Sequence, residues 1–92
     1  MSDEMQARMM EQAMQSYAAQ KQQLQGNLLE VESATRELQG ASVAYRIIGN
    51  IMVEKKAQDV LAELAEKKDR IQVRIAAIDK QQERFKRKED SP

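Results

Sequence analysis

The sequence YRIIGNIMV, residues 45–53, decides the fold of this 92-residue chain. Two short apolar runs flank Gly49 and Asn50, residues that tolerate a positive φ. The stretch therefore predicts a β-hairpin with a two-residue turn of a primed type. Such a turn fixes the cross-strand pairs, which are Ile48 with Ile51, Ile47 with Met52, and Arg46 with Val53.

Both faces of this hairpin are predicted to be apolar, because neighbouring residues of a strand point to opposite faces. One face carries Ile48, Ile51 and Val53, and the other carries Tyr45, Ile47 and Met52. A lone two-stranded hairpin is marginally stable in water, and folding back on its own coiled coil would cover one face only. Burying such a trio is worth several kcal/mol at about 25 cal/mol per Å² of apolar surface. We therefore expect other copies or other subunits to complete the hairpin. The predicted oligomerisation residues are Tyr45, Ile47, Ile48, Gly49, Asn50, Ile51, Met52 and Val53.

Long helices are predicted on either side of the hairpin, over residues 3–39 and 57–88. Seam positions recur alternately three and four residues apart from Ala7 to Leu38 and from Ala57 to Phe85, which is the spacing of a coiled coil. They are apolar except at Lys21, Thr35, Lys68 and Gln82. Acid-before-base pairs such as Glu63 and Lys67 support exposed helical faces. Two helices of similar length joined by a compact turn fold back antiparallel. The predicted fold is mostly α: one domain over residues 1–92, an antiparallel two-helix coiled coil with a short β-hairpin between the helices.

The composition excludes most enzyme classes. The chain has no Cys and no His, which removes thiol and imidazole catalysis, disulfides and the usual zinc ligand sets. Acidic residues follow no metal-ligand order, and no Gly-rich phosphate loop is present. We therefore expect no enzyme, no metal and no cofactor. An acidic start and the lack of a long apolar run favour a cytoplasmic location without a signal peptide or membrane contact.

A basic run near the end of the chain, Lys86, Arg87 and Lys88, would suit nucleic acid or an acidic membrane. The formal net charge of the whole chain is zero, however, and Phe85 is the only Phe available for stacking on bases. The alternative is a solvated helix end that complements the acidic start of the neighbouring helix. We favour this alternative and predict no nucleic-acid partner.

The order of elements resembles the beta-type subunit of prefoldin. A Gln-rich first helix, the segment YRIIGNIMVEKK and a second helix containing VLAELAEKKDRI follow one another in this chain. The family pattern is an aromatic-basic start, an apolar pair, Gly, a polar or Pro residue, three apolar residues and a lysine. The residues that match it in place are Tyr45, Arg46, Ile47, Ile48, Gly49, Asn50, Ile51, Met52, Val53 and Lys55. Coiled-coil helices alone match many proteins, so this central motif carries the resemblance.

The resemblance implies a hexameric, ATP-independent co-chaperone of the cytosol. Two alpha-type and four beta-type subunits would pool their hairpins into a β-barrel platform from which the coiled coils hang. Their tips would hold non-native client proteins and deliver them to a group II chaperonin. The alternative is a structural coiled-coil adaptor that binds one defined partner helix. Suppression of client aggregation separates the two functions.

Methionines gather at the start of the first helix: five of the six are Met1, Met5, Met9, Met10 and Met14. Methionine is flexible and polarizable, so a cluster suits a surface that must accept many shapes. The antiparallel fold brings the end of the second helix beside them. The predicted client-binding residues at this tip are Met5, Met9, Met10, Met14, Ile78 and Phe85. For the four of these that fall on the seam, the alternative is packing between the helices; these are Met10, Met14, Ile78 and Phe85.

Overall fold

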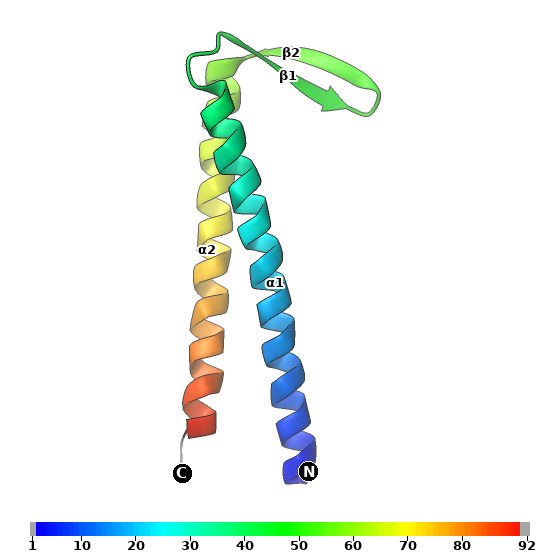
Figure 1. Cartoon of the computed structure of the whole chain (residues 1–92), viewed down its shortest axis with the longest axis vertical. Coiled ribbons are helices and arrows are strands. Elements are labelled where there is room, and N and C mark those ends of the chain that lie inside the picture. Colours follow the sequence, from blue (N-terminus) through cyan, green and yellow to red (C-terminus); the bar gives the residue numbers. More distant parts are fainter. Residues whose placement is uncertain (1, 91–92) are drawn as a thin grey trace.

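The protein consists of two long antiparallel helices joined by a β-hairpin (Figure 1). The computed structural model describes residues 2–90, with side chains as far as Lys86, so Met1 and the side chains of Arg87 and Lys88 lie outside it. The elements in order are α1 (Asp3–Leu38), β1 (Val43–Ile48), β2 (Ile51–Lys56) and α2 (Ala57–Asp90). The molecule is elongated, with extents of 60 × 26 × 14 Å. The predicted mostly-α coiled coil with one hairpin is confirmed.

Local sequence signals set both ends of α1. The backbone N–H of Met5 donates to Ser2 Oγ at 3.2 Å, which caps the first turn. The helix ends at Leu38, one residue before the predicted end at 39. Gly40 follows with φ of 79°, a conformation that glycine adopts without the steric cost of a side chain. This residue turns the chain toward the hairpin.

The start of α2 is fixed by a contact distant in sequence. The helix begins at Ala57, directly after β2 and with no loop between them. The Ala57 N–H donates to the carbonyl of Ser42 at 3.2 Å, and the Ala57 side chain is 1% exposed. This hydrogen bond satisfies a backbone donor that a side chain would otherwise cap. The helix continues to Asp90, two residues beyond the predicted end at 88.

The hairpin has the predicted register but is longer than predicted. Ile48 pairs with Ile51, Ile47 with Met52, and Arg46 with Val53. The structure corrects the predicted bounds of 45–53, because pairing continues at the base to Ala44 with Lys55 and Val43 with Lys56. In the turn Gly49 has φ of 60°, and no described non-glycine residue has a positive φ. The turn is therefore of type II′, with glycine at its first central position.

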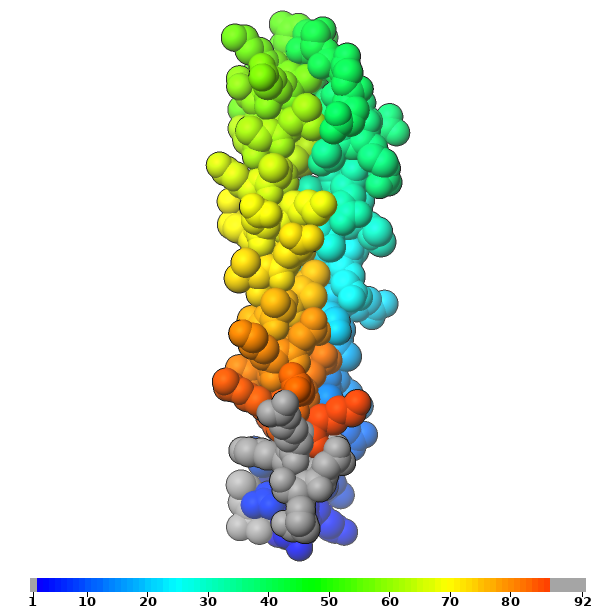
Figure 2. Space-filling model, turned by 90° about the vertical axis from the view of Figure 1, so that its left-hand side faces the viewer, coloured from blue at the N-terminus to red at the C-terminus, as the bar shows by residue number. Residues whose placement is uncertain are grey.

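The core is a single seam between the helices. Leu24 and Val31 of α1 are buried against Ile71 and Ile78 of α2. The half-buried residues packed against them are Tyr17, Leu28, Leu64 and Ile75. The predicted seam is confirmed except at Ala7, which is exposed. Figure 2 shows the side chains of the two helices as one continuous narrow column. This core lies between the helices, so it does not bury the large apolar side chains of the hairpin.

Candidate functional site: an exposed hairpin and a distal methionine tip

Exposed apolar side chains concentrate in the hairpin. Ten large hydrophobic residues are exposed in the described part of the chain, and six of them lie within residues 43–52. These six are Val43, Tyr45, Ile47, Ile48, Ile51 and Met52, with exposed fractions from 40% to 72%. Single exposed apolar residues are ordinary on protein surfaces, whereas a contiguous cluster marks an interaction surface.

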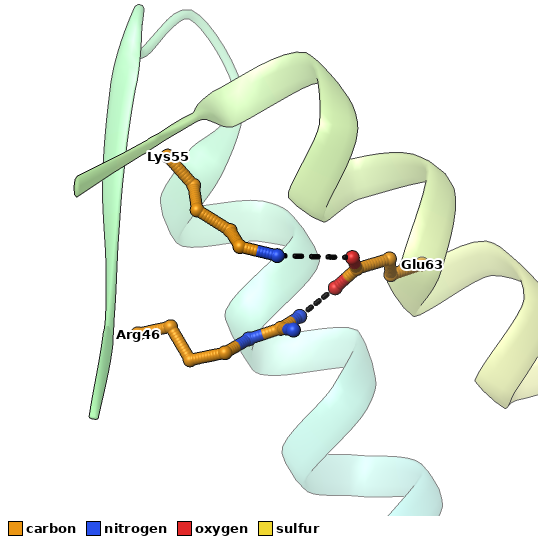
Figure 3. Close-up of polar contacts among 3 residues, drawn as sticks. All are labelled: Arg46, Lys55 and Glu63. Atoms are coloured by element: carbon orange, nitrogen blue, oxygen red, sulfur yellow. Dashed lines mark hydrogen bonds and ion pairs between the residues drawn. The ribbon is translucent and has the colours of Figure 1, made fainter. Parts of the chain in front are cut away.

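The two faces of the hairpin differ in their contacts with α2. Residues paired across the strands share a face, so Ala44, Arg46 and Lys55 lie on the same face, which we call the inner face. Arg46 and Lys55 point toward Glu63 of α2 (Figure 3). The Arg46 guanidinium contacts Glu63 Oε2, and Lys55 Nζ lies 3.5 Å from Glu63 Oε1 (Figure 3). Ala44 is buried beside them. This ion-pair clamp, Arg46–Glu63–Lys55, ties the hairpin base to the coiled coil.

The opposite, outer face carries Val43, Tyr45, Ile47 and Met52, all exposed. The prediction of two apolar faces therefore needs correction at the base of the inner face, where the polar clamp lies against α2. Ile48 and Ile51 share that inner face but stand at the turn, beyond the clamp, and remain exposed. The exposed apolar side chains of the hairpin thus lie on its outer face and at its turn.

The clamp was not predicted from the sequence. Glu63 was expected to pair with Lys67 along the exposed face of α2, but the structure pairs it with Arg46 and Lys55 instead. Lys55 lies eight residues before Glu63 and Arg46 lies seventeen before it. Arg46 and Lys55 lie on strands and not on the helix of Glu63, so it is the placement of the hairpin over α2 that brings the three together.

The other candidate residues lie at the end of the coiled coil away from the hairpin, where the helix ribbons diverge (Figure 1). Met5 is 55% exposed and Met9 54%, while Met10 and Met14 are half-buried. We call these four residues the methionine tip. Phe85 of α2 packs on Tyr17 of α1, with ring centroids 5.7 Å apart. It closes the seam next to the tip.

Ile78 does not join the exposed surface. It is only 9% exposed and belongs to the core with Leu24, an arrangement that favours packing over client contact. No group of His, Cys, Asp or Glu side chains in residues 2–86 is arranged to hold a metal ion. Within the described residues, no helix has the length and apolar content that crossing a membrane requires.

Comparison with known proteins identifies the architecture. A family model described as "Prefoldin subunit" matches residues 3–90. The chain belongs to the prefoldin subunit family. It is 33% identical over 84 residues to the prefoldin subunit beta of Archaeoglobus fulgidus, covering 88% of this chain and 72% of that one. It is 30% identical over 81 residues to the prefoldin subunit beta of Pyrococcus furiosus, covering 85% and 69%.

The fold comparison agrees with these relatives. The crystal structure of the prefoldin beta subunit from Thermococcus strain KS-1 superposes with a TM-score of 0.83 at 29% identity, covering 90% of this chain and 75% of that one. The sequence resemblance to a beta-type prefoldin subunit is thereby confirmed. Prefoldin subunits are non-enzymatic co-chaperones, and membership assigns this chain a co-chaperone role in assembly with other prefoldin subunits.

Proposed function

We propose that this subunit holds non-native proteins, without ATP, at the distal end of its coiled coil and delivers them to a group II chaperonin. It does so in the cytoplasm, within a hexamer of two alpha-type and four beta-type subunits. The hairpin joins the subunits through Tyr45, Ile47, Ile48, Gly49, Asn50, Ile51, Met52 and Val53. Met5, Met9, Met10 and Met14 contact the client, together with the half-buried Phe85.

The observation that carries this proposal is the separation of two apolar surfaces along one rod. Six exposed hydrophobic side chains occupy the hairpin, and Met5 and Met9 stand at the opposite end of α1. A surface used for assembly is covered by neighbouring subunits, whereas a surface for unfolded chains has to stay open. Because the two surfaces lie at opposite ends of an elongated molecule, the hairpin can be covered by neighbouring subunits while the distal end stays open to clients.

The test is protection of a chemically unfolded model protein from aggregation, measured by light scattering without nucleotide. The subunit is assembled with an alpha-type prefoldin subunit. We expect protection when the assembly and the client are present in nearly equal amounts. Protection should fall several-fold when Met5 and Met9 are both replaced by Ser. The matched control is Leu29→Ser, which removes an even more exposed apolar side chain from the middle of α1 (67% exposed).

Two outcomes contradict the proposal. An assembly that gives no protection rules out client holding and favours an adaptor with one defined partner. Equal losses in the Met variant and the Leu29 control show that binding is not located at the tip. Delivery is tested separately, by adding a group II chaperonin with ATP and measuring recovery of native client.

A further inference from the structure

The methionine thioethers are the only sulfur atoms of this chain, because it contains six Met and no Cys. Susceptibility of a thioether to oxidation follows its exposure. Met5 and Met9 are one turn apart on the same face of α1, and both are more than half exposed. Met10 and Met14 are shielded in part by the seam. The structure therefore ranks Met5 and Met9 as the sulfurs of the tip that solvent oxidants reach first.

Met52 is the remaining described methionine, and it lies on the outer face of the hairpin with 64% exposure. The proposed assembly covers this face, which removes Met52 from solvent. Among the described methionines, the accessible sulfurs of the assembled subunit are then confined to the distal end. Oxidation there leaves the joined hairpins untouched.

We propose that Met5 and Met9 are peroxide-modification sites, and that their conversion to sulfoxide reversibly switches off client holding. This inference rests on the proposed holding function. The thioether sulfur attacks one oxygen of hydrogen peroxide, so that an S–O bond forms and the O–O bond breaks. The second oxygen leaves as water with both protons; the sulfur is oxidised by two electrons and the peroxide is reduced.

The product changes the surface without disturbing the fold. A sulfoxide is polar, whereas a thioether is apolar and flexible, so oxidation removes the apolar contact that the side chain makes with a client segment. Neither Met5 nor Met9 belongs to the core of the coiled coil, and α1 therefore stays folded. Methionine sulfoxide reductases A and B each reduce one epimer of the sulfoxide, which makes the modification reversible.

The first experiment maps the oxidation order. The assembled protein is treated with hydrogen peroxide, and peptides are followed by mass spectrometry over time. We expect Met5 and Met9 to oxidise several-fold faster than Met10, Met14 and Met52. In the unassembled subunit we expect Met52 to oxidise as fast as Met5. Equal rates for all five sulfurs in the assembly would overturn the ranking.

The second experiment measures protection against aggregation before and after peroxide treatment, as a ratio for each protein. We expect a several-fold loss for the native sequence and its recovery with both reductases. Met5→Leu with Met9→Leu should keep a ratio near one, whereas Met10→Leu with Met14→Leu should lose protection as the native sequence does. Met1 is unchanged in both variants, so its oxidation contributes equally to them.

The outcomes separate the two proposals. Full protection by an assembly oxidised at Met5 and Met9 overturns the switch while the holding function stands. The same holds if the Met5 and Met9 variant loses protection as much as the native sequence. No protection before treatment contradicts the holding function and with it the switch, whereas the oxidation map still decides the order of reaction.

Discussion

The guanidinium of Arg46 on β1 contacts the carboxylate of Glu63 on α2, and this ion pair links the hairpin to the coiled coil (Figure 3). Both side chains are close to half exposed, so the pair adds at most about 1 kcal/mol to stability. We expect it to act on the orientation of the hairpin instead. A subunit whose hairpin already points in one direction loses less conformational freedom on assembly.

Replacing Glu63 by Gln should weaken assembly with little effect on the fold. The amide keeps the shape of the side chain but loses the charge that attracts Arg46 and Lys55. We expect unchanged helical circular dichroism and an assembly constant weakened by up to about fivefold, the equivalent of about 1 kcal/mol. Sedimentation velocity with an alpha-type subunit measures it. Glu66→Gln is the control, since Glu66 is exposed on the same helix. Equal effects of the two substitutions would show that the clamp does not preset the hairpin.

Charges on the outer face of the hairpin should prevent assembly. Ile47→Asp with Met52→Asp places two carboxylates on a cross-strand pair that is exposed in the free subunit, so we expect the free chain to stay folded. Burying these charges in an interface is unfavourable without partners. Ile48→Asp with Ile51→Asp tests the turn in the same way. Analytical ultracentrifugation should then show small species with helical circular dichroism retained, and an unchanged oligomer mass contradicts the assembly role.

Gly26→Ala should stabilise the coiled coil. Gly26 lies inside α1, and a Cβ added there meets nothing within 4 Å. Alanine is favoured over glycine in a helix interior by about 1 kcal/mol, which corresponds to a rise in Tm of about 4–8 °C for a domain of this size. Gly49→Ala is the contrasting variant, because the positive φ of Gly49 strains any larger residue. Thermal unfolding of both proteins measures the difference, and a rise in Tm for Gly49→Ala contradicts the turn geometry.

Leu24→Ala should destabilise the chain far more than Leu29→Ala, although both are leucines of α1. Leu24 is buried in the core cluster and Leu29 is exposed. Truncating a buried leucine costs about 2–5 kcal/mol, whereas exposed positions change stability by about 0.5 kcal/mol or less. Chemical denaturation followed by circular dichroism measures both. Equal losses would mean that the seam does not carry the stability of the coiled coil.

The sequence predicted those features that depend on residues close together along the chain. The apolar repeat identified the seam, and Gly49 with Asn50 fixed the register of the hairpin. Features that depend on contacts between residues distant in the sequence were not predictable from such local patterns. Helix α2 begins at Ala57, whose N–H donates a hydrogen bond to the carbonyl of Ser42. Glu63 forms an ion pair with Arg46 because the base of the hairpin lies over α2. Ile78 was ambiguous for a related reason: periodicity places a residue on the seam but does not tell how closely the helices approach there.

The direct joint at Ala57 has a mechanical consequence. No loop separates β2 from α2, and the hydrogen bond from Ala57 to Ser42 spans the junction. When the hairpin tilts, the helix is therefore expected to rotate with it about this junction. A helix of this length reaches about 50 Å at 1.5 Å per residue, so a 10° rotation at one end sweeps the other through about 9 Å. In the assembly proposed above, small differences in the tilt of neighbouring hairpins would therefore become large differences in the width of the space between the distal ends of the coiled coils.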